Sequence, residues 1–274
     1  MFKKIGLIMN PDKAEAVDLT RVASDYLHNH GIDSVCLQDP ECKREGTDLI
    51  LTFGGDGTFL IGARMAMEYD VPLMGINLGT VGFLTEAEPD RLTEALDAIL
   101  NNQYQIEERF LLKVKFTRTG EIFYALNDAV ITRGRFARLI RVECKVNGEP
   151  FGVFTADGMI AATPTGSTGY SLSAGGPIVD PRMNCILLTP VCAHSLQRCP
   201  FVVSEKSVIS MHLQAERKQT AELQIDGMDR GKLEAGDEII ASGCEKTIRL
   251  LRIHSFHFFT RLQQKLIEWG SNHE

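Results

Sequence analysis

The 274-residue sequence lacks the features that mark several large classes of proteins. No apolar run reaches the roughly 18–20 residues that a membrane-spanning helix requires. The first ten residues begin like a secretory signal, with two lysines before an apolar stretch, but that stretch is too short and ends at Asn10-Pro11-Asp12. We therefore expect a first β-strand there, a cytoplasmic protein and no membrane association.

The seven cysteines include no CxxC pair. Cys185, Cys192 and Cys199 recur every seven residues, a spacing that would suit a heptad or a metal site. Pro190 and Pro200 would break such a helix, and no second ligand cluster completes a zinc site. We predict free, buried thiols in a reducing compartment and no metal site made from protein ligands.

The sequence also has no excess of basic residues, since 29 Lys and Arg stand against 36 Asp and Glu for a net charge of −7. This balance argues against a nucleic-acid-binding protein. A bound anionic nucleotide would have to be held locally, by backbone N–H groups and a few arginines. One cluster of arginines fits either a solvated strand edge or a phosphate or subunit contact: Arg133, Arg135, Arg138 and Arg141.

The first hundred residues alternate short apolar runs with stripes of helical period. Buried strands are expected at 5–9, 49–53 and 71–76. Amphipathic helices are expected around 19–27, 59–67 and 92–100, where apolar side chains recur at i, i+3 and i+4. This alternation predicts a mostly parallel sheet with helices on its faces.

From about residue 105 the pattern changes to short β-rich runs, several of them separated by Gly, Asn or Asp. Strands are expected at 111–116, 121–125, 129–132, 139–146, 208–213, 223–225, 238–241 and 247–253. We predict an all-β segment of two packed sheets. A helix should follow over the last twenty residues, because Phe258, Leu262, Leu266 and Trp269 share one face.

The bend Gly54-Gly55-Asp56-Gly57-Thr58 joins an expected strand to an expected helix. Glycines permit positive φ and let a polyphosphate approach the backbone, and the helix N-terminus offers N–H groups to an anion. Asp56 would orient a hydroxyl or hold Mg²⁺. A tight turn with an N-cap is the alternative. No GK[ST] follows and no GxGxxG is present, so neither a Walker A loop nor a hydride-transfer dehydrogenase is indicated.

A second candidate site is the run from Asp157 to Pro177, which is rich in Gly, Ser and Thr and has Tyr170 as its only aromatic residue. Hydroxyls, backbone donors and one ring suit a ribose, a phosphate and a base. A flexible linker is the alternative, against which Tyr170, Leu172 and the prolines argue. A third piece, Asn127-Asp128, is either a turn or a pair that holds a ribose diol.

Together, these three motifs resemble the bacterial NAD kinase family in their order and separation, over nearly the whole chain. The first motif alone also occurs in diacylglycerol and sphingosine kinases, and 6-phosphofructokinases have a relative of it. The TPTGST and YSLSAGGP segments of the second motif separate NAD kinases from these enzymes. A lipid kinase and a non-catalytic dinucleotide sensor remain as alternatives.

The resemblance implies transfer of the γ-phosphoryl group of ATP, with Mg²⁺ or another divalent metal, to the 2′-hydroxyl of the adenosine ribose of NAD, giving NADP. Asp56 matches the general base, and the bend implies phosphate contacts at Gly54, Gly55, Gly57 and Thr58. The implied NAD-binding positions are Asp56, Gly57, Asn127, Asp128, Arg138, Thr155, Asp157, Thr168, Gly169, Tyr170, Ser171, Leu172 and Ser173. Thr155 and Gly169 depart from the family pattern, where a basic residue and an alanine are usual.

The expected fold is a Rossmann-like α/β domain over 1–104, a β-rich, β-sandwich-like NAD-binding domain over 105–254, and a C-terminal helix over 255–274 that returns to the first domain. The active site is expected between the domains, with Asp56 facing the loop 168–173. The resemblance also implies a homodimer or homotetramer.

Overall fold

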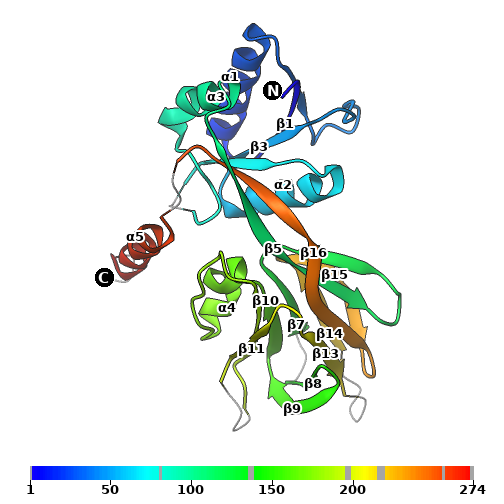
Figure 1. Cartoon of the computed structure of the whole chain (residues 1–274). Helices are drawn as coiled ribbons and strands as arrows, with labels where there is room; N and C mark the ends of the chain where they lie inside the picture. The colour runs from blue at the N-terminus through cyan, green and yellow to red at the C-terminus, as the bar shows by residue number, and fades with distance from the viewer. Residues whose placement is uncertain are drawn as a thin grey trace. The chain divides into compact units, whose positions relative to one another are not determined.

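The computed structural model describes residues 2–79, 82–134, 139–194, 199–214, 220–254 and 257–271 (Figure 1). The chain divides into two compact units. The first unit joins Met1–Glu108 to Ile248–Glu274, and the second unit is Arg109–Thr247. The first unit is therefore assembled from both ends of the chain.

The first unit contains a parallel sheet in which β2, β1, β3 and β4 lie side by side in that order. Leu250, near the end of β16, pairs in parallel with Leu73 of β4. The strands are β1 (Lys4–Met9), β2 (Asp33–Cys36), β3 (Leu49–Gly54), β4 (Leu73–Asn77) and β16 (Glu238–Arg252). The structure confirms the buried strands expected from the sequence. It adds β2, which is too short and too exposed to stand out as an apolar run.

Helices cover both faces of this sheet (Figure 1). Helices α1 (Ala14–Asn29) and α3 (Leu92–Leu100) share an apolar cluster with Leu51. Helix α2 (Asp56–Tyr69) packs on the opposite face, where a Cβ built on Gly62 would lie 2.4 Å from Thr52. Successive strand residues point to opposite faces, so neighbouring Leu51 and Thr52 contact different helices. The short turn η1 (Pro89–Arg91) precedes α3, and α5 (Phe258–Ser271) is the last element. The Rossmann-like prediction is confirmed.

The second unit consists of two antiparallel sheets. One has the order β12-β11-β10-β7-β14-β15, and in the other β16, β13, β8 and β9 are neighbours, with β5 pairing both β16 and β6. Side chains of both sheets form one apolar cluster, which confirms the predicted pair of packed sheets. The strands are β5 (Gln105–Phe116), β6 (Ile122–Ala125), β7 (Asp128–Arg133), β8 (Ile140–Val146), β9 (Glu149–Ala156), β10 (Gly158–Ala162), β11 (Cys185–Val191), β12 (Phe201–Ser204), β13 (Val208–Leu213), β14 (Thr220–Ile225) and β15 (Met228–Glu234).

The prediction of separate strands at 238–241 and 247–253 is wrong, because β16 is a single strand of 15 residues. Gly243 lies in its middle without making a turn. A Cβ at that position would lie 2.4 Å from the carbonyl oxygen of Glu205, so the glycine permits close packing of two backbones.

All seven cysteines are free. Cys144 and Cys185 are buried, whereas Cys192 and Cys199 are exposed, so the prediction of buried thiols is wrong for those two. In the described part of the chain, no helix is both long enough and apolar enough to span a membrane.

Candidate functional site

The bend after β3 places Asp56 at the first residue of α2. A Cβ on Gly54 would lie 2.3 Å from the hydroxyl of Thr58, so only glycine lets the strand end pack against the helix start. Open space surrounds the Cβ positions of Gly55 and Gly57, which leaves their backbone accessible. None of these three glycines has a positive φ. Close packing and backbone access therefore explain these glycines, and the positive φ that glycine permits is not used here.

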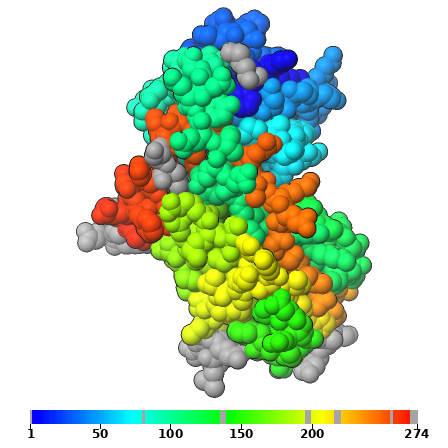
Figure 2. Space-filling model, viewed as in Figure 1, coloured from blue at the N-terminus to red at the C-terminus, as the bar shows by residue number. Residues whose placement is uncertain are grey.

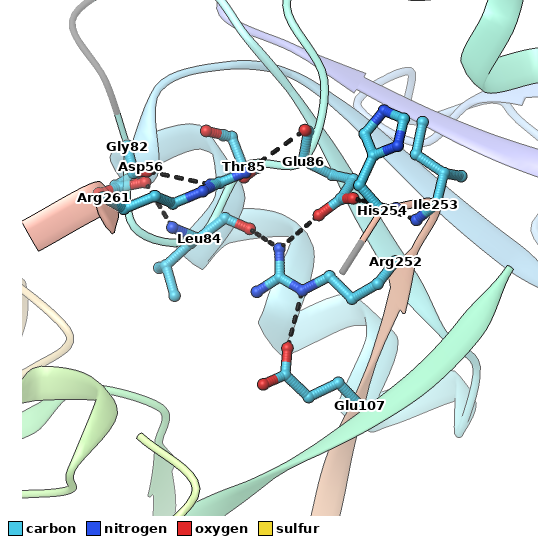
Figure 3. A network of polar contacts seen from close by, with 10 residues as sticks. All are labelled: Asp56, Gly82, Leu84, Thr85, Glu86, Glu107, Arg252, Ile253, His254 and Arg261. Atoms are coloured by element: carbon cyan, nitrogen blue, oxygen red, sulfur yellow. Dashed lines mark hydrogen bonds and ion pairs between the residues drawn. The ribbon is translucent and has the colours of Figure 1, made fainter. Parts of the chain in front are cut away.

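The carboxylate of Asp56 is held by backbone donors of a loop that follows β4. The N–H groups of Phe83 and Leu84 each donate to it at 3.3 Å, and Figure 3 shows Leu84 beside Asp56. A Cβ on Gly82 would lie 2.6 Å from the same carboxylate, so the loop backbone packs directly against Asp56. Sequence reasoning missed this loop. Its signal is a pair of glycines at 79 and 82 directly after the buried strand β4.

In the second unit, the backbone before β7 is anchored by Asp226. The N–H groups of Leu126, Asn127 and Asp128 donate to its carboxylate at 2.9, 2.7 and 3.1 Å. From the other side, the N–H of Thr163 donates to the carbonyl of Asn127 at 2.8 Å. The segment Leu126–Asp128 is therefore more than a turn, since its three N–H groups and the carbonyl of Asn127 are bound to groups distant in the chain.

Two polar atoms near this anchor are buried without a hydrogen-bond partner in the described part of the chain: Oδ1 of Asn127 and Oγ1 of Thr165. Their segments touch, because a Cβ on Gly166 would lie 2.2 Å from the carbonyl oxygen of Asn127. A buried acceptor or hydroxyl without a partner is costly unless a ligand or water bonds to it. Asn127 therefore stays a candidate to bind a ligand, and Thr165, which sequence reasoning had not selected, joins it.

Asp128 is buried beside a second carboxylate. Burial raises the pKa of Asp128 to about 7, and the neighbouring charge of Asp226 contributes to the increase. Asp128 therefore changes charge near neutral pH, and when protonated it can donate a hydrogen bond as well as accept one.

Tyr170 lies within electrostatic range of Asp157 and Asp128. Burial raises the pKa of Tyr170, and Cys192, Asp157 and Asp128 raise it further. Asp157 also binds Arg133, through an ion pair of 2.5 Å and a backbone hydrogen bond of 2.9 Å. Arg133 therefore contributes its positive charge next to Asp157. Tyr170 is 45% exposed, and the α4 segment lies at the surface in Figure 2.

The serine- and threonine-rich run is ordered as η2 (Thr165–Thr168) and α4 (Tyr170–Ser173), so the flexible-linker alternative is wrong. Ser171 is buried and its hydroxyl is 2.9 Å from that of Thr189, whereas Ser173 is exposed. The hydroxyl of Thr168 bonds back to the carbonyl of Thr165. Gly169 and Leu172 are half-buried within the same turns.

One further predicted position lies on a strand. Thr155 is on β9, where its carbonyl accepts the N–H of His194 at 2.8 Å. Arg138 lies outside the described residues.

Comparison with known protein families matches both parts of the chain. Residues 37–104 match the ATP-NAD kinase N-terminal domain and residues 126–253 match the ATP-NAD kinase C-terminal domain. The chain belongs to the NAD kinase family. The resemblance drawn from the three motifs is thereby confirmed, and nothing in the comparisons supports the lipid-kinase alternative.

The similarity to individual NAD kinases covers nearly all of the sequence. An NAD kinase of Methanothermobacter thermautotrophicus is 38% identical over 97% of both chains, and one of Heliobacterium modesticaldum is 36% identical over 96% of this chain and 98% of its own. Among solved structures, yeast NADH kinase complexed with NADH has a TM-score of 0.86 at 25% identity and covers 97% of this chain and 87% of its own. An NAD kinase from Archaeoglobus fulgidus in complex with ATP has a TM-score of 0.75 at 26% identity and covers 95% and 99%.

Proposed function

We propose that the protein transfers the γ-phosphoryl group of ATP to the 2′-hydroxyl of the adenosine ribose of NAD and so makes NADP. Membership of the NAD kinase family supports the reaction. The observation that carries the residue assignment is the Asp56 carboxylate, which stands at the start of α2 and is held by two backbone N–H groups. A carboxylate in such a position is oriented rather than free to rotate.

In the proposed step, the 2′-oxygen forms a bond to the γ-phosphorus while the bond from that phosphorus to the bridging oxygen of ADP breaks. The hydroxyl proton passes to Asp56, and ADP leaves. Phosphoryl transfer depends mainly on positioning and charge stabilisation. Asp56 therefore acts as much by aligning the hydroxyl as by accepting its proton. The accessible backbone of Gly55 and Gly57 and the N-terminal N–H groups of α2 suit the phosphates of ATP.

ATP-dependent kinases use a divalent metal, for which we propose Mg²⁺. Among the residues that the structure describes, no three His, Cys, Asp or Glu side chains gather in a way that could hold a metal ion. The Asp56 carboxylate beside accessible backbone fits a metal held mainly by the nucleotide phosphates, as is common for Mg²⁺. When bound, the metal would neutralise charge on the phosphates.

The second unit supplies the residues that we propose to bind NAD. Asn127 and Thr165 each offer a buried polar atom without a protein partner in the described chain. Tyr170 presents a partly exposed ring close to Asp157 and Asp128. An amide, a hydroxyl and an aromatic face are the groups that bind a base and a ribose. We assign the remaining predicted NAD-binding positions in η2 and α4 to the same site.

The decisive assay incubates the purified protein with ATP, Mg²⁺ and NAD and measures NADP with an NADP-specific dehydrogenase. The wild type should form NADP and should not phosphorylate diacylglycerol. Asp56→Asn should keep its fold by circular dichroism and lose about 10²–10⁴-fold in turnover, the range expected for a general base. Near-wild-type NADP formation by Asp56→Asn would remove Asp56 from the mechanism, and binding of NAD without turnover by the wild type would favour a dinucleotide sensor.

We further propose that the enzyme is cytoplasmic and forms a homodimer or homotetramer through its second unit. Seven free thiols are typical of a reducing compartment. Phe151 on β9 is 40% exposed and its ring centroid lies 3.8 Å from that of Phe201 on β12. Phe201 is half-buried, so the pair exposes one aromatic ring, which suits a subunit contact.

A further inference from the structure

The loop Gly82–Glu86, whose N–H groups hold Asp56, is itself bonded to four residues near the end of the chain, which we call the C-terminal arm: Arg252, Ile253, His254 and Arg261. These contacts join residues that are 166 to 179 positions apart in sequence. Figure 3 shows Arg261 beside Asp56 at one end of the loop and Arg252 beside Glu86 at the other.

Arg261, on α5, bonds to the carbonyl side of the loop. Its Nη1 donates to the carbonyl of Gly82 at 3.2 Å and to that of Thr85, and its Nη2 donates to that of Glu86 at 3.5 Å. The loop therefore donates its N–H groups to Asp56 and accepts from Arg261 through its carbonyls. A guanidinium is a rigid plane of donors, so it can set the spacing of several carbonyls at once, which the single ammonium of lysine does not.

The other end of the loop is held by Glu86 and Arg252. The Glu86 carboxylate accepts the N–H groups of Ile253 and His254 at 3.1 and 2.9 Å and pairs with Arg252 at 2.9 Å. Arg252 also donates to the carbonyl of Leu84 at 3.2 Å. The side chains of Glu86 and Arg252 are only 2% and 3% exposed, so this end is a buried anchor.

Arg261 lies within electrostatic range of the reacting carboxylate. Burial and the charge of Arg252 lower the pKa of Arg261, while Glu86, Glu88 and Asp56 act in the opposite direction. Asp56 thus faces both a backbone that Arg261 orders and the positive charge of Arg261.

We infer that Arg261 is a positioning residue for the phosphoryl transfer: it orders the loop Gly82–Glu86, and the loop orients the Asp56 carboxylate. The inference rests on the proposed function. It predicts a loss of turnover with little change in NAD affinity, because the hydrogen bonds of Arg261 go to carbonyls of the loop that orients the reacting carboxylate.

The test compares Arg261→Met with Gln264→Met, a matched change at an exposed position of the same helix. Arg261→Met should lower kcat about 10–100-fold and leave KM for NAD within about threefold, in line with the cost of a small misplacement of a reacting group. Gln264→Met should behave as the wild type. Arg261→Lys keeps the charge and the long stem, so it should fold even if Arg261→Met does not. Its kcat should lie between that of the wild type and that of Arg261→Met.

A second readout is independent of activity. Amide hydrogen exchange at Phe83 and Leu84 should be about tenfold faster in Arg261→Met than in Gln264→Met, because the carbonyls of the loop lose the guanidinium that donates to them. Equal kcat and equal exchange in the Arg261 and Gln264 variants would overturn the inference, as would a loss confined to KM. A wild type that makes no NADP would refute the proposed function, and the exchange experiment would still test whether Arg261 orders the loop.

Discussion

Replacing Asp128 by asparagine should change how the stability of the protein depends on pH. Asp128 has a pKa of about 7 in the folded protein, against 3.8 for the ordinary carboxyl group. The folded state therefore holds a proton that the unfolded chain releases between about pH 4 and pH 7. As the pH rises through this interval, the folded state must either keep Asp128 protonated while free protons become scarce or ionise a buried carboxyl group next to Asp226. Both lower the free energy of unfolding.

The size of the effect follows from the two pKa values. A difference of about three pH units at about 1.4 kcal/mol each gives about 4 kcal/mol, fully lost by about pH 8. Asp128→Asn cannot ionise, so it should not lose this stability. Relative to the wild type, the variant should gain about 4 kcal/mol between pH 4 and pH 8, which corresponds to about 10 °C in the unfolding midpoint for a chain of this size.

Urea unfolding of both proteins across pH 4–8.5 measures this difference directly. Asp229→Asn is the control, because it removes an exposed carboxylate from the same unit. Its stability relative to the wild type should stay within about 0.5 kcal/mol at every pH. A constant offset between Asp128→Asn and the wild type over this range would refute the assignment of a proton to Asp128.

Two further pairs of substitutions, each a test and its control, probe the packing of Gly166 and the ion pair of Glu86. Gly166→Ala should abolish NAD binding, measured by titration calorimetry, because its Cβ would lie 2.2 Å from the carbonyl oxygen of Asn127. Gly169→Ala is the control and should be tolerated, since the nearest atom to its Cβ would be 3.3 Å away. Glu86→Gln should lower the free energy of unfolding by about 1.5–3 kcal/mol, because it removes the charge of one of the two carboxylates that pair with buried Arg252, the other being Glu107. Urea unfolding checks this, with Glu268→Gln, from an ion pair of 3.9 Å whose carboxylate is 36% exposed, expected to cost less than about 1 kcal/mol.

The sequence predicted those elements whose signal is local. Apolar runs and helical stripes gave β1, β3, β4, α2 and α3, because burial on one face leaves a period in the chain. Such periodicity weakens in half-exposed strands such as β2, and a glycine that serves close packing looks the same in the sequence as a glycine that serves a turn. Gly243 shows this ambiguity, since it led to one strand being predicted as two.

The candidate site was predictable where chemistry is concentrated in short motifs. The bend around Asp56 and the pair Asn127-Asp128 stood out from residue types and spacing alone. Asp226 and Arg261 did not, because each acts on backbone atoms about 100 or more positions away in the chain. A hydrogen bond to a carbonyl or an N–H group places no demand on the identity of the residue that it reaches, so no pattern in the sequence pairs the two partners.

The first unit is interrupted in the chain by the whole of the second, and this sets an order of events during synthesis. A ribosome releases residues 1–108 long before Arg261 emerges. The first unit therefore stays incomplete, without its β16 strand and its last helix, while the second unit is synthesised and folds. Such distant contacts close late and slowly. Translation that stops before the final helix would therefore yield a protein with all three characteristic motifs intact but without the contacts of Arg261 to the loop beside Asp56.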